Sequence, residues 1–448
     1  MKKVGTFILV VCVGVAVLVA LRVRPATVAL DPPTGQPAIP WIRPDPNAFS
    51  AAEPNQTAFD LTYRGLSGAK DELFSASFWG FGSSRPQEDP PFIKALTDKG
   101  IGPLHLVYNP YLKGAEWSAV ELGRGKPVAF YLDLDANGKV TSNERMLPAP
   151  TDTKDSVDFL TPDFCLTPRE GPQVPFRVLL RVRSDASDVS CMWAPACVLQ
   201  GESPFNGQAT KLVLFPNGPT GTFDGFGRSR CALASGQERI RDAAHSLSSL
   251  MLHQEQFYQV QVRSRLDRGA VRVVLAKDVS PRGKLVATVA CDNDPGAEIA
   301  SAAIEGRNAP VFLALQKGEQ ELPVGPYRLS YGSVTYGIGD SAWQCDFTRG
   351  PSFDVADSQE AKVSLGRPRL TVRAIPEDKR YEQDVQCQSA YTRGAKIYIT
   401  REVQGLASEA YGRFSKKGDK TWYQDVQPQI RITDPNGAEV ISKAMEYG

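Results

Sequence analysis

K-P-V-A-F-Y-L-D-L-D-A-N-G-K-V-T-S-N-E-R-M-L, from Lys126 to Leu147, is the stretch that most clearly decides the fold. Its first seven residues are mostly apolar and β-prone, with Pro127 near the start, so they predict a strand. The segment Thr141 to Met146 has a helical composition, and Pro148 and Pro150 would end such a helix after about two turns. The pattern therefore predicts a strand, a turn-rich loop and a short helix.

Oxygen-bearing side chains recur at alternate positions of this loop in the pattern D-x-D-x-N-G-x-x-x-x-x-E. The matching residues are Asp133, Asp135, Asn137, Gly138 and Glu144. Calcium is a hard cation that binds about six to eight oxygen atoms, and glycine permits the sharp turn between them. The pattern resembles the calcium loop of EF-hand proteins.

The resemblance implies a Ca²⁺ ion and a set of ligands. These are Asp133, Asp135, Asn137, Lys139 through its backbone carbonyl, Thr141 and Glu144. Val140 would attach the loop to an apolar core. The alternative is a solvated acidic turn, D-A-N-G, before a helix start. Because a strand leads into the loop, the two-helix arrangement of a calcium sensor is missing, and we expect a structural site.

Residues 1–24 have the composition of a targeting segment. An unbroken apolar run from Val4 to Leu21 is flanked by lysines and arginines and is long enough to span a bilayer. We favour an uncleaved signal anchor, a single-pass transmembrane helix, over a cleaved signal peptide. The anchor predicts a cell-membrane protein with exported C-terminal domains, whereas cleavage predicts a secreted or periplasmic protein.

The composition of the 448-residue chain favours many short strands joined by turns. It contains 34 prolines and 38 glycines and shows few helical patterns. We expect a mainly β fold of several β-sandwich-like modules with few short helices, such as Phe92 to Asp98. With 51 basic and 50 acidic residues, no net field indicates a nucleic-acid partner.

Changes in composition and periodicity divide the chain after its targeting segment. A Pro-rich linker occupies residues 25–57, and a β-rich domain carrying the calcium loop occupies residues 58–275. Two further β units are expected at residues 276–366 and 367–448. Within the first domain, Ser235 to Leu252 is the best helix candidate, because its apolar residues recur at helical spacing.

Two short motifs carry further resemblances. Residues 322–329 (L-P-V-G-P-Y-R-L) resemble the P-x-G-x-Y-x-L signature of transthyretin-like, carboxypeptidase-regulatory-type modules. A hairpin of residues 428–433 and 438–441, joined by Asp434 to Gly437, is typical of immunoglobulin-like or related sandwiches. The whole layout resembles exported bacterial β-sandwich proteins of uncharacterised function that carry a strand-borne calcium loop.

Seven cysteines lie outside the apolar run. Cys191 and Cys197 are close enough in sequence for a small disulfide loop in an oxidising compartment. The alternative for the cysteines is scattered buried thiols.

The motifs of common catalytic sites are missing from the sequence. It contains no G-x-S-x-G, H-E-x-x-H or phosphate-loop motif and only three histidines. We expect a binding or cell-envelope structural role, with an extracellular protein or glycan as partner. An exported polysaccharide or peptide hydrolase, stabilised by calcium, is the alternative. A dockerin-like assembly module is disfavoured, because the related stretch Pro216 to Asp224 lacks the acidic positions.

Overall fold

The computed structural model describes residues 30, 41–45, 47–74, 78–81, 89–108, 117–134, 137–150, 155–166, 173–184, 189–218, 222–236, 238–290, 297–316, 318–339, 342–379, 396–416, 429–433, 436 and 438–444. The predicted anchor or signal helix at residues 1–24 lies outside this set. Within the described residues, no helix is both long and apolar enough to cross a bilayer.

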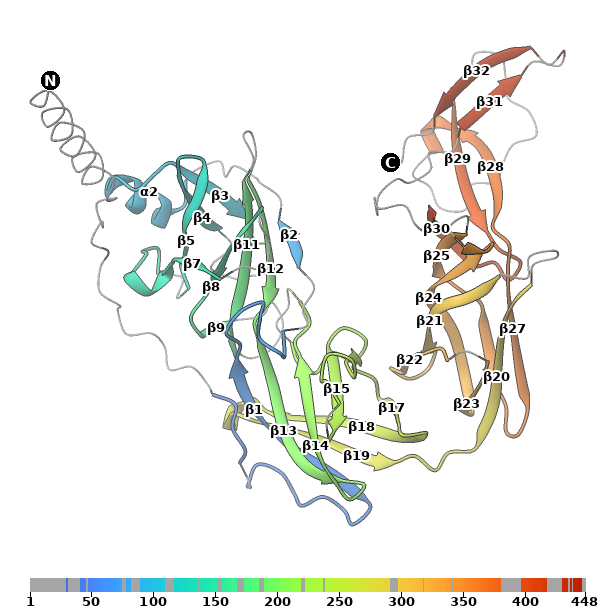
Figure 1. Ribbon diagram of the computed structural model, residues 1–448, viewed down its shortest axis with the longest axis horizontal. Helices are drawn as coiled ribbons and strands as arrows, with labels where there is room; N and C mark the ends of the chain where they lie inside the picture. The colour runs from blue at the N-terminus through green and yellow to red at the C-terminus, as the bar shows by residue number, and fades with distance from the viewer. Residues whose placement is uncertain are drawn as a thin grey trace, which may run out of the picture.

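The fold is mainly β, as predicted. The described residues contain a single α-helix, α2 (Pro91–Asp98), close to the helix expected there, and otherwise strands with short 3-10 turns. Figure 1 shows two lobes that meet near β19 and β20 and diverge from there. The first lobe carries β1 to β19, and the second carries β20 to β32.

An eight-stranded antiparallel sheet forms the frame of the first lobe. Its order is β16 (His245–Ser246), β15 (Arg230–Ser235), β14 (Gln208–Phe215), β13 (Cys197–Phe205), β1 (Gln56–Gly65), β19 (Ala270–Lys277), β18 (Gln256–Arg265) and β17 (Leu250–His253). The first strand of the chain therefore lies inside the sheet, where Phe59 and Leu61 are fully buried. Strands β18 and β19 form a hairpin, with Gly269 in a left-handed conformation at its turn.

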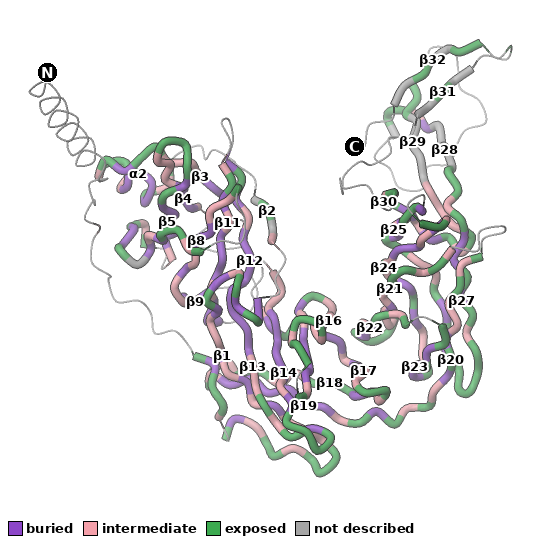
Figure 2. Tube along the Cα trace, viewed as in Figure 1, coloured by how far each residue is buried: buried purple, intermediate pink, exposed green. Residues whose placement is uncertain are grey.

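Three smaller sheets complete this lobe. One has the order β2 (Trp79–Phe81), β12 (Val189–Pro195), β11 (Val178–Ser184), β8 (Val157–Leu160) and β7 (Pro148–Ala149). Another has the order β3 (Leu104–Tyr108), β4 (Trp117–Gly123), β5 (Lys126–Leu132) and β6 (Arg145–Met146), and β10 (Val174–Phe176) pairs with β9 (Phe164–Leu166). Figure 2 shows buried positions concentrated along β11, β12 and β14. The fully buried Trp193 lies in the main core of this lobe, the apolar cluster that also contains Phe59 and Leu61.

The second lobe contains three sheets. One has the order β23 (Glu319–Pro323), β20 (Arg282–Ala290) and β27 (Glu360–Gly366). A larger sheet has the order β22 (Phe312–Ala314), β21 (Glu298–Gly306), β24 (Gly325–Tyr336), β25 (Trp343–Arg349), β30 (Ala410–Lys416), β29 (Ile397–Gln404) and β28 (Arg369–Pro376), with β26 (Ser352–Val355) paired to β24. The hairpin of β31 (Gln429–Thr433) and β32 (Glu439–Ala444) is present as predicted. Because β30 pairs with β25, this sheet continues across the expected boundary at residue 366.

The segment before β1 is packed against the first lobe where it is described. Ile42 is 1% exposed and belongs to the main core, and its carbonyl accepts a hydrogen bond from the Tyr63 amide at 3.0 Å. The Arg43 amide donates to the carbonyl of Gly269 at 2.8 Å. Part of the Pro-rich segment is therefore attached along the edge of the β18–β19 hairpin.

The helix predicted from Ser235 to Leu252 is wrong. This segment forms the end of β15, a series of turns, and the short strands β16 and β17. Its apolar residues lie in three different cores. Ile240, Ala243 and Ala244 pack on a cluster around Leu73. Leu247 and Met251 lie in the main core, and Leu250 lies in the core of the second lobe. A single helix face cannot reach three cores.

The predicted disulfide between Cys191 and Cys197 is also wrong. Both cysteines are free and buried, as are Cys231 and Cys345, while the half-exposed Cys165 is free as well. Cys191 lies on β12 of the five-stranded sheet, and Cys197 begins β13 of the eight-stranded sheet. Burial raises the pKa of both thiols to about 12, so they are protonated and packed as small apolar groups.

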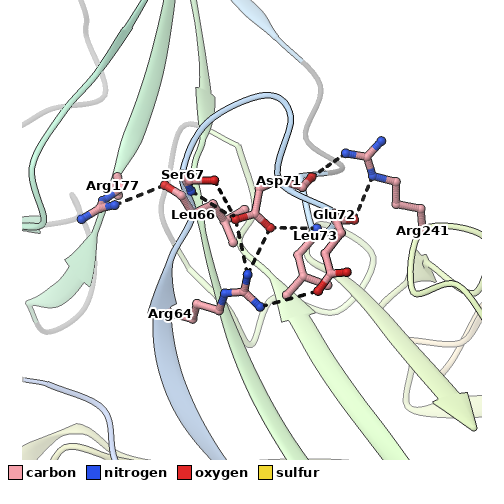
Figure 3. A network of polar contacts seen from close by, with 8 residues as sticks. All are labelled: Arg64, Leu66, Ser67, Asp71, Glu72, Leu73, Arg177 and Arg241. Atoms are coloured by element: carbon pink, nitrogen blue, oxygen red, sulfur yellow. Dashed lines mark hydrogen bonds and ion pairs between the residues drawn. The ribbon is translucent and has the colours of Figure 1, made fainter. Parts of the chain in front are cut away.

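A polar network around Asp71 holds the loop that follows β1 (Figure 3). The Asp71 carboxylate accepts hydrogen bonds from the Ser67 and Leu73 amides at 3.2 and 3.1 Å and pairs with Arg64 at 3.3 Å. Arg241 donates to the carbonyl of Asp71 at 2.6 Å. The turns that replace the predicted helix are thereby attached to this loop.

We expect Asp71→Ala to lower the free energy of unfolding by about 2 kcal/mol, because the buried Leu73 amide and the partly buried Ser67 amide lose their acceptor. Burial alone would raise the pKa of Asp71, but the hydrogen bonds from Leu73 and Ser67 and the charge of Arg64 outweigh it and lower the pKa. The stabilisation is therefore complete above about pH 4, the ordinary range of the unfolded group, and is lost as the pH falls through the lower folded pKa. Urea unfolding of both proteins across this range measures it.

Asp267→Ala is the matched control, since Asp267 pairs with Arg265 on the exposed β18–β19 turn. An Asp71→Ala protein as stable as the Asp267→Ala protein at pH 7 would contradict the assignment.

Candidate metal site

The predicted calcium loop joins β5 to β6, and the pairing of these two strands closes it. Phe130 pairs with Met146 and Tyr131 pairs with Arg145 in antiparallel register. Asp133 comes shortly after Tyr131, and Glu144 comes directly before Arg145. The two acidic residues therefore lie at the two ends of one closed loop. A strand leads into the loop, as expected.

The Asp133 carboxylate organises the first half of the loop. Its Oδ1 accepts a hydrogen bond from the Asn137 amide at 3.0 Å, and its Oδ2 accepts one from the Gly138 amide at 2.8 Å. Gly138 has φ of 77°, a left-handed conformation that favours glycine. The Asn137 side-chain oxygen accepts from the Lys139 amide at 2.8 Å. These contacts turn the backbone around Asp133 at the position where the motif places its glycine.

The Glu144 carboxylate closes the second half of the loop. It is 1% exposed, and its Oε1 accepts from the Leu134 amide at 2.8 Å. Its Oε2 accepts from both the amide and the hydroxyl of Thr141, each at 2.8 Å. All of these donors are neutral. In the described part of the chain no basic side chain pairs with Glu144, and the adjacent Arg145 pairs with Glu121 at 3.8 Å.

The two-turn helix predicted after the loop is wrong. Residues Ser142–Glu144 form one 3-10 turn, in which Thr141 and Glu144 bond each other as a capping box. The next two residues then join β6, because their backbone groups pair with β5. The site is therefore a strand–loop–strand unit.

The remaining predicted residues of the loop agree with their expected positions where they are described. Val140 is 4% exposed and packs in a small core with Phe92 and Leu96 of α2, whereas Lys139 is exposed to solvent. The Gly138 position lies close to Pro91 at the start of α2. Asp135 lies outside the described residues. The loop thus rests on α2 through Val140.

The described residues suit a hard cation only in part. No group of three or more His, Cys, Asp or Glu side chains among them is placed to hold a metal ion, and this count omits Asp135. Two acidic residues, Asp133 and Glu144, are nevertheless buried at 5% and 1% exposure. Among the described residues only neutral donors contact the buried Glu144 carboxylate, so a cation between the ends of this loop would stabilise it. Oxygen donors favour calcium or magnesium over softer metals.

A brace beneath the loop was not predicted. The Tyr131 hydroxyl donates to Glu121 at 2.6 Å and accepts from the Arg145 Nε at 3.1 Å. Burial, followed by the bond to Glu121, raises the pKa of Tyr131 well above its ordinary range, so the phenol is neutral. No sequence spacing indicates this set, because the pairing of β4, β5 and β6 brings the three residues together.

Cys231 and His245 form a contact of the kind that nucleophilic catalysis uses. Cys231 Sγ lies 3.6 Å from His245 Nδ1, which also contacts the carbonyl of Ser246 at 2.9 Å. Burial raises the pKa of Cys231 to about 12 and lowers the pKa of His245. Both groups are therefore neutral at pH 7, and the thiol lacks the thiolate character of a catalytic cysteine.

The hydrolase alternative requires a pocket with two carboxylates. A polar hollow of about 750 Å³ between the lobes is lined in part by Glu255, Asp278, Glu319 and Glu321. Asp278 is paired with Arg282 at 2.7 Å. Hydrolysis stays a prediction.

No known family model matches this chain, and no curated protein or solved structure is significantly similar to it.

We expect Gly138→Ala to lower the free energy of unfolding by about 1 kcal/mol, because alanine is strained at positive φ. The nearest atom to an added Cβ is a Pro91 carbon at 3.5 Å, so the cost comes from the backbone and not from a clash. Gly138→Asn is the matched control, since asparagine tolerates this conformation better. Thermal unfolding in the presence of a chelator measures both. Equal melting temperatures for the alanine variant and the parent would contradict the left-handed turn.

Proposed function

We propose that this chain is an exported calcium-binding protein in which the Asp133–Glu144 loop holds a structural Ca²⁺ ion. The observation that carries the proposal is the buried Glu144 carboxylate, which only neutral donors contact among the described residues. The buried Asp133 at the opposite end of the same loop supports it. A cation between the two ends of the closed loop would offset the charge of the buried Glu144 carboxylate.

The ligands are Asp133, Asp135, Asn137, the Lys139 carbonyl, Thr141 and Glu144. Three carboxylates against a divalent cation leave one net negative charge, a balance suited to calcium. Glu144 Oε2 accepts two bonds from Thr141 in the structure. The Thr141 hydroxyl therefore turns away from Glu144 when the ion binds, which frees a lone pair on that oxygen.

The ion stabilises the unit of α2 and β3 to β6, because the loop contributes Val140 to its small core. A strand–loop–strand frame has no pair of helices to open, so the role is structural. Calcium sites of extracellular modules have dissociation constants of about 10⁻⁴ to 10⁻³ M. Such a site is largely filled at the calcium concentrations outside cells.

The rest of the proposal concerns location and partners. Residues 1–24 anchor the chain in the cell membrane, and the exported lobes consist of β-sandwich modules of transthyretin-like and immunoglobulin-like type. Tyr327 supports the first type, since its hydroxyl donates to the Pro323 carbonyl at 2.9 Å across the turn of the P-x-G-x-Y-x-L motif. The modules act in binding an extracellular protein or glycan, or in cell-envelope structure.

We expect about 5 mM Ca²⁺ to stabilise the protein by about 1 kcal/mol relative to a chelator, if the dissociation constant is about 1 mM. For a lobe of this size the melting temperature of the first transition rises by about 2–4 °C. Asp133→Ala abolishes the rise, because it removes both a ligand and the acceptor that shapes the turn. Differential scanning calorimetry with calcium and with chelator measures the effect.

Asp98→Ala is the matched control, since Asp98 is an exposed acid on α2 in the same unit. This variant keeps the full response to calcium. Identical melting curves of the parent with calcium and with chelator would exclude the proposal.

A further inference from the structure

The two lobes are joined by one short connection, which we name the interlobe joint (residues 278–282). It runs from the end of β19 to the start of β20. The Asp278 side chain is 2% exposed and pairs with Arg282 Nη1 at 2.7 Å. Its Oδ1 also accepts hydrogen bonds from Gln259 at 3.0 Å and Ser280 at 2.9 Å. One carboxylate therefore contacts β18 of the first lobe and β20 of the second.

Arg282 adds two contacts across the same joint. Its guanidinium lies 4.7 Å from the centroid of the Phe257 ring on β18. Its Nη2 donates to the backbone carbonyl of Asp278 at 3.0 Å, and the Asp278 amide donates to the carbonyl of Phe257 at 2.9 Å. The connection is held at both ends by the same pair of residues, although Val279 between them is 86% exposed.

A second set of contacts lies where β17 meets β22. The Phe312 amide donates to the Ser248 hydroxyl at 2.9 Å, and the Ser249 amide donates to the Pro310 carbonyl at 2.9 Å. Leu250 and Phe257 from the first lobe also belong to the apolar core of the second lobe. These contacts form a narrow seam about which one lobe can turn relative to the other.

The joint is open on one side. A hollow of about 750 Å³ separates the β17–β18 turn, with Gln254 and Glu255, from Glu319 and Glu321 on β23. Asp278 and Arg282 also line this hollow. On that side the hollow takes the place of dense packing between the lobes, and the Asp278–Arg282 pair is the contact that spans the joint beside it.

We infer that the ion pair of Asp278 and Arg282 fixes the angle between the two lobes, so that the joint acts as a rigid elbow whose release lets the lobes turn about the β17–β22 seam. Removal of the Asp278 charge leaves Arg282, whose side chain is 23% exposed, without its partner, which favours an opened joint where water reaches the guanidinium more fully. Large domain movements of this kind are absorbed by a few residues at the ends of secondary elements. The inference is independent of calcium binding.

The test measures the distance between the lobes in the full chain. Spin labels are placed through unnatural amino acids at Glu202 on β13 and Thr348 on β25, both of which are exposed. Double electron–electron resonance on the parent is expected to give one narrow distance distribution. Asp278→Ala and Asp278→Asn are expected to lose this single distance and give a broad distribution.

Asp278→Asn keeps an oxygen for Gln259 and Ser280 and removes only the charge, so it decides the question if Asp278→Ala fails to fold. Arg328→Ala is the matched control, because Arg328 pairs with Glu305 at 2.7 Å on the surface of the second lobe. This variant is expected to keep the narrow distribution. A broad distribution in the parent, or a parental distribution in Asp278→Asn, overturns the inference.

Discussion

Strand β1 pairs with β13 on one side and with β19 on the other, and the first lobe depends on this placement. Its partners lie far along the chain, with Thr62 opposite Gln200 and Phe59 opposite Val273. The eight-stranded sheet of the first lobe therefore cannot close until residues up to the end of β19 are available. Such long-range pairing loses much chain entropy before the stabilising contacts between the strands can form, which makes folding slow. Ile42 packs beside β1, so the segment before the sheet also depends on the placement of this strand.

The candidate metal loop likewise depends on strand pairing, over a shorter stretch of chain. The ladder between β5 and β6 brings the ends of the loop together, and α2 covers it through the contact with Val140. A helix pair does the same work in the EF-hand proteins that the motif resembles. The same loop residues can therefore be held by different secondary structures. A pair of strands has no helices to open, so this frame suits a structural ion better than a signalling ion.

Sequence patterns predicted the local features well. The β-prone run from Lys126 to Leu132 forms β5, and the hairpin expected near the C-terminus is present as β31 and β32. Within the loop, the left-handed Gly138, the buried Val140 and the exposed Lys139 follow from the motif alone. These features are set by residues close together in sequence, through backbone preferences and side-chain polarity. The binding of an ion by this loop stays a prediction.

Residues 235–252 mark the limit of such reasoning. Their apolar spacing correctly indicated burial, but spacing cannot tell whether one core or three will receive the side chains. The same holds for the Glu121–Tyr131–Arg145 brace and for the Asp278–Arg282 pair, whose partners are defined by neighbouring strands and lobes. The sequence by itself determined a β-rich chain with one loop of calcium-type residues. Only the tertiary structure decided which strands are neighbours, because strand pairing depends on contacts between residues that are distant in sequence.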